Sequence, residues 1–138
     1  MAKFFWTTGS SILAFLGIIH LILTFFTNKF QTKDPALAKA MKLTSPVLSD
    51  NFTMWSGWQG FNASHSAGLI FIGLINIYLM TKYPEMMKAD FSLYILNIIT
   101  IGFYIVLAWR YWFNIPLFGL SISILCFIIS FALAILKK

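Results

Sequence analysis

His20 and His65 are the two histidines of the chain, and both lie inside long apolar segments. A polar side chain in such a segment costs free energy in lipid, so each needs a hydrogen-bonding partner or a function. Imidazole rings donate and accept hydrogen bonds, and they also ligate zinc and haem iron. The two histidines are therefore the first candidates for a functional site.

The spacing of the residues predicts that these side chains face each other. At about 100° per residue, His20 and Thr24 share one face of the first apolar segment. By the same count, Trp58, Asn62 and His65 share one face of the second segment. Consecutive spans run antiparallel, and a rise of about 1.5 Å per residue places both histidines roughly 6–10 Å below the same membrane surface.

Several interpretations of this polar layer stay open. In the first, the histidines are neutral and hydrogen-bond to a carbonyl or a neighbouring side chain, which joins the first two spans. In the second, the layer lines a pocket for a lipid, a quinone or another small amphiphile. In the third, His20 and His65 are the axial ligands of haem b, and Arg110 binds a propionate. The candidate ligand-binding residues are His20, Thr24, Trp58, Asn62, His65, Trp109 and Arg110.

The remaining polar residues argue against catalysis. A mononuclear zinc or iron enzyme needs a third protein ligand beside the two histidines, and the apolar segments hold no carboxylate. All four acidic residues are expected in loops, so a proton relay of the pump type lacks its usual carrier. We therefore predict no catalytic residue, no metal site and no cofactor, with haem b as the alternative.

Membrane-spanning helices must position these residues, because the chain is too apolar for a water-soluble domain. Of its 138 residues, 59% are hydrophobic and 10% are charged, and the mean hydropathy is +0.83. This composition also excludes a disordered chain and a nucleic-acid-binding domain. Four segments reach the length of about 20 residues that spans the hydrocarbon, at 4–26, 61–80, 91–113 and 117–136. The predicted fold is all-α, an antiparallel four-transmembrane-helix bundle that forms a single domain over 1–138.

The connection 27–60 is the longest, and we predict that it is partly helical. Asp34 and Pro35 suit the N-cap and the first position of a short helix over 35–43. Two interpretations of this helix stay open. It lies on the bilayer surface with its lysines toward the phosphates, or it is an ordinary loop helix.

The local sequence also predicts where the second-span helix begins and where the third span ends. Ser49 and Asp50 are predicted to cap a helix that begins near Asn51 and continues into the second span. The third and fourth spans are joined at 114–116, a connection so short that it predicts an antiparallel helical hairpin.

Small residues recur at helical spacing in the fourth span: Gly119, Ser123, Cys126, Ser130 and Ala134. Such faces allow close helix packing, within the chain or in a homo- or hetero-oligomer. The predicted partners are the lipid bilayer and a small amphiphile or quinone, but no nucleic acid.

Five short motifs resemble those of an uncharacterised family of small bacterial four-helix integral membrane proteins. They lie at 17–21, 34–37, 45–48, 53–55 and 58–68. The last contains the signature Gly-Phe-Asn-x-Ser-His, which ends at His65. The resemblance implies a four-span protein of the bacterial inner membrane and implies no activity, cofactor or catalytic residue.

The orientation depends on few cations, because the two sides carry equal numbers and the positive-inside rule does not decide. Lys3, Lys82, Lys88, Lys137 and Lys138 lie on the side of the termini, and Lys29, Lys33, Lys39, Lys42 and Arg110 lie on the other. Lys3 and the final two lysines stand closest to span ends, which favours cytoplasmic termini in a multi-pass protein.

The predicted topology places Lys39 and Lys88 on opposite sides of the membrane. Cysteines introduced at these two positions should therefore be labelled by a membrane-impermeant reagent from opposite sides. Labelling of both positions from the same side would contradict the four-span arrangement.

Overall fold

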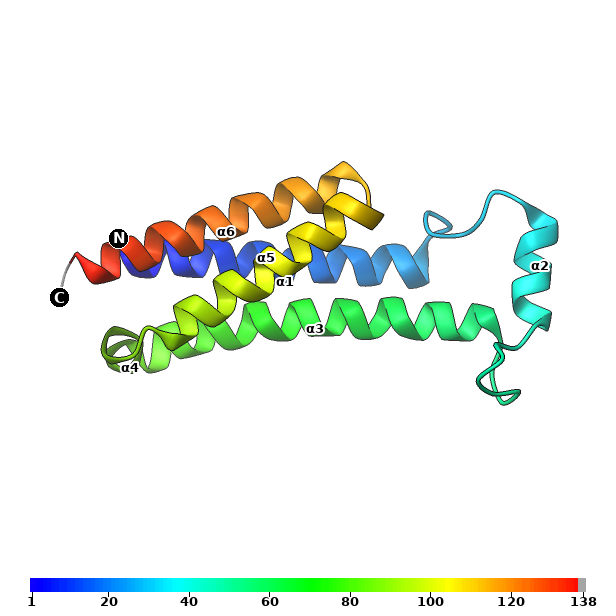
Figure 1. Cartoon of the computed structure of the whole chain (residues 1–138), viewed down its shortest axis with the longest axis horizontal. Helices are drawn as coiled ribbons and strands as arrows, with labels where there is room; N and C mark the ends of the chain where they lie inside the picture. The colour runs from blue at the N-terminus through cyan, green and yellow to red at the C-terminus, as the bar shows by residue number, and fades with distance from the viewer. Residues whose placement is uncertain (137–138) are drawn as a thin grey trace. The chain divides into compact units, whose positions relative to one another are not determined.

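The computed structural model of the chain describes residues 1–136, except for the side chain of Lys88, and every regular element in them is a helix (Figure 1). The helices are α1 (Ala2–Phe26), α2 (Pro35–Leu43), α3 (Met54–Lys82), α4 (Pro84–Ala89), α5 (Ser92–Tyr111) and α6 (Asn114–Ile135). By length and composition, α1, α3, α5 and α6 can cross a membrane. The predicted all-α class is confirmed. Lys137 and Lys138, which entered the orientation argument, lie outside the described residues.

The short helix predicted after the first span is present as α2. Asp34 is its N-cap, and the Asp34 carboxylate accepts a hydrogen bond from the Ala36 amide at 2.9 Å. Pro35 occupies the first helical position, where its missing amide hydrogen costs nothing because first-turn amides have no partner within the helix.

The helix of the second span begins later than predicted, at Met54, and its capping residue is Thr53 rather than Ser49 or Asp50. Thr53 Oγ1 accepts from the Ser56 amide at 3.2 Å, and Ser56 Oγ accepts from the Thr53 amide at 3.0 Å. This reciprocal pair satisfies two amides at the helix start. Ser49 instead accepts from the amide two residues further on, within the preceding turn.

Two connections also differ from the sequence prediction. The residues 114–116, predicted as the last turn, form the beginning of α6, so the chain reverses over Trp112 and Phe113. A proline in the first helical turn is tolerated for the same reason as in α2. Glu85, expected in a loop, lies in the short helix α4.

The chain divides into two compact units, Gly17–Gly68 and the combination of Met1–Leu16 with Leu69–Lys138. The second of these, here called the packed unit, contains α4, α5, α6 and the adjoining segments of α1 and α3. The first, here called the histidine unit, contains α2 together with the ends of α1 and α3 that flank the long connection.

In the packed unit, two hydrogen bonds show that α1 and α6 are antiparallel. Ser130 Oγ donates to the Ala2 carbonyl at 2.8 Å, and Ser123 Oγ donates to the Gly9 carbonyl at 3.0 Å. Residue numbers therefore rise along α1 as they fall along α6. These bonds also show that the small-residue face of α6 packs against α1 within one chain, so an oligomer would have to use other faces.

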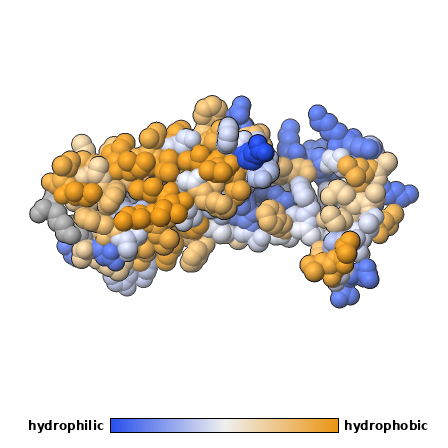
Figure 2. Space-filling view, viewed as in Figure 1, coloured by the Kyte–Doolittle hydropathy of each residue, from blue (hydrophilic) through white to orange (hydrophobic). Residues whose placement is uncertain are grey.

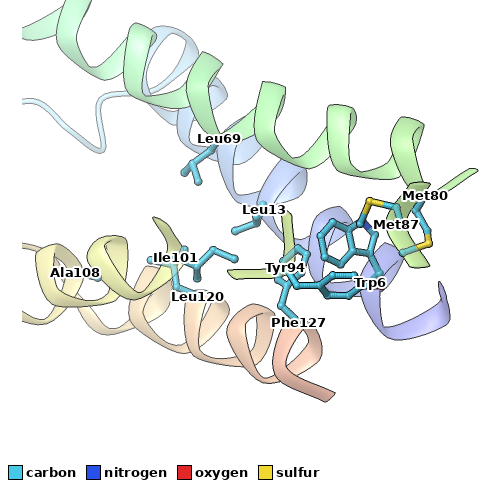
Figure 3. Packing of buried hydrophobic residues seen from close by; sticks show 10 residues of the cluster. All are labelled: Trp6, Leu13, Leu69, Met80, Met87, Tyr94, Ile101, Ala108, Leu120 and Phe127. Atoms are coloured by element: carbon cyan, nitrogen blue, oxygen red, sulfur yellow. The ribbon is translucent and has the colours of Figure 1, made fainter. Parts of the chain in front are cut away.

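Aromatic rings pack together with aliphatic side chains and methionines in the core of the packed unit (Figure 3). The Trp6 ring makes edge contacts with Tyr94 and Phe127, at centroid distances of 4.6 and 4.7 Å. The Trp6 indole N–H donates to the Asn76 carbonyl at 2.9 Å. One residue of α1 thus contacts α3, α5 and α6, which fixes their relative positions.

Besides its hydrophobic core, the structure buries several polar side chains and exposes many large apolar ones. Among the residues whose burial the structure describes, seven polar ones are buried: Ser10, Thr24, Ser66, Asn76, Asn97, Ser123 and Ser130. Large apolar side chains are exposed on every spanning helix, among them Phe15, Phe71, Phe103 and Phe118. Figure 2 shows hydrophobic side chains gathered over α5 and α6. Such an apolar exterior is stable in lipid and would aggregate in water.

Gly73 allows α1 and α3 to approach closely. A Cβ atom at this position would lie 2.6 Å from the Ser10 carbonyl oxygen and 2.7 Å from the Ala14 backbone nitrogen. These are backbone atoms, which cannot move aside as a flexible side chain can.

The substitution Gly73→Ala should therefore destabilise the protein by about 1–3 kcal/mol, the usual cost of overpacking. Thermal unfolding in detergent micelles, followed by circular dichroism, measures this effect. Gly102→Ala is the matched control, because a Cβ there would meet only Ile124 Cδ1 at 3.9 Å. Equal unfolding temperatures for the two variants would contradict the close approach.

Candidate functional site

The histidine unit contains a hydrogen bond between α1 and α3. His20 Nε2 lies 2.9 Å from Asn62 Oδ1. The Asn62 amide is oriented by a second bond, in which Nδ2 donates to the Trp58 carbonyl at 2.8 Å. Because the carbonyl oxygen Oδ1 only accepts, the proton of this bond belongs to His20 Nε2. The side-chain amide thus selects one tautomer of the His20 ring.

His65 lies beside this pair, as the sequence predicted. Its ring and that of His20 are in edge contact, with centroids 5.5 Å apart and planes inclined by 73°. The Phe61 ring is stacked nearly parallel to the His65 ring at 6.4 Å. The Phe30 ring packs on His20 at 4.7 Å and lies 6.5 Å from Trp58. Aromatic rings therefore frame both imidazoles.

The hydroxyls near the layer are satisfied within their own helices. Thr24 Oγ1 donates to the His20 carbonyl at 2.8 Å, and Ser66 Oγ donates to the Asn62 carbonyl at 2.8 Å. Each hydroxyl is therefore hydrogen-bonded although it has no partner on another helix, and its burial carries no cost of an unsatisfied donor. Thr24 is therefore part of the layer but directs its only proton back to the backbone.

Five of the seven predicted site residues belong to one connected group in the histidine unit. Hydrogen bonds link Thr24, His20, Asn62 and Trp58 in that order, and ring contact adds His65. The other two predicted residues, Trp109 and Arg110, lie in the packed unit at the end of α5, where both are exposed.

Sequence reasoning missed Phe30 as a member of the site. It follows α1 in the irregular connection, where helical periodicity gives no information about direction. A second pair of polar side chains joins two helices elsewhere in the chain. Asn76 Nδ2 donates to Asn97 Oδ1, and Asn97 Nδ2 donates back at 3.3 Å, which joins α3 to α5 in the packed unit.

His20 and His65 are the side chains of this site that could ligate a metal ion or haem iron. Among the described residues, no group of three histidine, cysteine or acidic side chains is placed to hold a metal ion. Haem ligation needs an unprotonated ring nitrogen directed at the iron. His20 Nε2 carries a proton and is bonded to Asn62, so binding iron there would require loss of that hydrogen bond.

No protein-family model, curated protein or solved structure matches this chain. The resemblance carried by the Gly-Phe-Asn-x-Ser-His motif therefore stays a prediction.

The hydrogen bond to His20 leads to a spectroscopic prediction. Protein expressed with added haem precursor and purified in detergent should show no reduced α-band after dithionite treatment, because binding iron at His20 Nε2 would cost the hydrogen bond to Asn62. A sharp α-band that disappears in both His20→Ala and His65→Ala, but persists in Thr24→Ala, would overturn this prediction. It would establish the bis-histidine haem b alternative instead.

Proposed function

We propose that this chain is an integral membrane protein that crosses the bilayer four times and acts as a structural or interaction protein. In this proposal, the layer formed by His20, Asn62 and His65 connects α1 to α3 and performs no chemistry of its own. The proposal includes cytoplasmic termini and a bacterial inner membrane as the location.

The side-chain distribution supports the membrane part of the proposal. Lipid offers no hydrogen bonds, so polar groups within it need internal partners. Among the described residues, no buried side-chain nitrogen or oxygen lacks a hydrogen-bond partner. The outward faces, by contrast, carry large apolar side chains.

The single observation that carries the connecting role is the His20–Asn62 hydrogen bond. It joins residues 42 positions apart in sequence, one on α1 and one on α3, at 2.9 Å. The second bond of Asn62, to the Trp58 carbonyl, holds the amide in the orientation that receives the imidazole proton.

A second candidate function is the binding of a small amphiphile or quinone at the same layer. The aromatic rings of Phe30, Trp58 and Phe61 favour it, because they would supply apolar walls beside the directional imidazoles. In that case a ligand's polar group would compete with Asn62 for the His20 proton. Electron transfer through a bound quinone is one form of this candidate.

A double-mutant cycle tests the connecting role. His20→Phe and Asn62→Leu should each destabilise the protein, and their combined effect should fall short of the sum by about 0.6 kcal/mol, with an upper bound of about 1.7 kcal/mol. Reversible unfolding in mixed micelles, followed by circular dichroism, gives the free energies.

The control cycle pairs His20→Phe with Ser64→Ala. The Ser64 hydroxyl bonds only to the Phe61 carbonyl of its own helix and is exposed, so these two effects should add. If the His20 and Asn62 effects also add, the layer does not connect the helices and the proposal fails.

A further inference from the structure

The histidine unit carries an open groove of about 560 Å³ beside α2. One wall is the turn at Gln31 and Thr32, and the other is the face of α2 that presents Ala38, Lys39 and Lys42. None of the residues predicted from the sequence to bind a ligand lines this groove. It is therefore a separate feature from the histidine layer.

The charge of the groove is positive. Lys39 and Lys42 both line it and are exposed, whereas no acidic side chain does. The nearest acidic residue in sequence, Asp34, is occupied as the N-cap of α2 through its bond to the Ala36 amide. The long connection as a whole carries four lysines and two aspartates, so it has a net charge of +2.

Lys42 is held in place by aromatic contacts. Its ammonium lies 5.0 Å from the centroid of the Trp55 ring, within the range of a cation–π interaction. Trp55 in turn stacks on Trp58, with ring centroids 5.5 Å apart. The Met54 amide also donates to the Thr44 carbonyl at 2.8 Å, which ties the end of α2 to the start of α3. The groove is thus anchored to the spanning helix.

Exposed apolar side chains follow the lysines along the chain. Leu43, at the end of α2, is 72% exposed, and Leu48, in the next turn, is 88% exposed. Val47 beside it is fully exposed, and Figure 2 shows hydrophobic atoms at the tip of this turn. Cations next to exposed apolar residues are typical of segments that lie at the membrane interface. Exposure of these apolar side chains to water would cost free energy, whereas their insertion into the acyl region of a bilayer would not.

We propose that this groove binds the phosphate-bearing headgroup of an anionic phospholipid. Lys39 and Lys42 contact the phosphate, and Leu43, Val47 and Leu48 enter the acyl boundary beside it. This inference requires the protein to lie in a bilayer, as proposed above, but it does not depend on the role of the histidines. Of the two interpretations of α2, this proposal adopts the surface-bound helix.

Lipid binding to the intact protein in detergent tests the proposal by native mass spectrometry. Phosphatidylglycerol should bind more tightly than phosphatidylcholine, and Lys39→Gln with Lys42→Gln should weaken its binding by about 25-fold, at about fivefold for each lysine near a lipid surface. The matched control is Lys29→Gln with Lys33→Gln, which removes the same charge from residues outside the groove. This control should change the affinity by less than threefold.

Three results would overturn the proposal. Equal losses in the two double variants would show that only the net charge of the connection matters. Equal affinity for the two lipids would exclude headgroup recognition. Complete displacement of the lipid by millimolar inorganic phosphate would show that the groove binds free phosphate instead. Far-UV circular dichroism of each variant establishes that its helices are intact.

A failure of the histidine proposal can be distinguished from a failure of this one. His20→Phe should leave phosphatidylglycerol binding unchanged, because His20 does not line the groove. If His20→Phe and the groove variant lose lipid to the same extent, the two sites are not separate and the inference fails.

Discussion

The scarcity of hydrogen-bonding partners in lipid is the constraint on which the rest of this structure depends. In the part of the chain that the structure describes, each buried polar side chain has a hydrogen-bond partner in its own helix or in a neighbouring one. Ser123 and Ser130 join α6 to α1, and the Asn76–Asn97 pair joins α3 to α5. The His20–Asn62 bond does the same for α1 and α3 in the histidine unit.

The same constraint accounts for the small residues. A serine hydroxyl reaches a carbonyl on another helix only if the two backbones are close. Gly9 provides this proximity in α1, since a Cβ there would lie 3.1 Å from the Cys126 Cβ and from the Ser123 carbonyl oxygen. Because many polar and small residues lie between the helices, the outward faces carry large apolar side chains. This distribution of side chains, like the hydropathy of the chain, is compatible with a bundle of helices that crosses a membrane.

Much of this arrangement could be predicted from the sequence, because long apolar runs and the 3.6-residue period are local properties. The four long apolar helices, the cap at Asp34 and the contact between His20 and His65 all follow from them. The start of α3 was placed wrongly, since Thr53 and Ser49 are equally suitable caps and only the reciprocal bond with Ser56 decides. The groove beside α2 was not predicted, because the wall opposite α2 is the irregular turn at Gln31 and Thr32, whose direction no periodicity specifies.

The tautomer of His20 in a lipid bilayer tests the central claim most directly. Nitrogen-15 NMR of ring-labelled protein distinguishes the two neutral tautomers, and a His65→Phe variant assigns the signals to His20. The hydrogen bond to Asn62 predicts a protonated Nε2 and an unprotonated Nδ1, with a shift of the Nε2 resonance in Asn62→Leu. An unprotonated Nε2 in the unmodified protein would contradict the proposal that this bond connects α1 and α3.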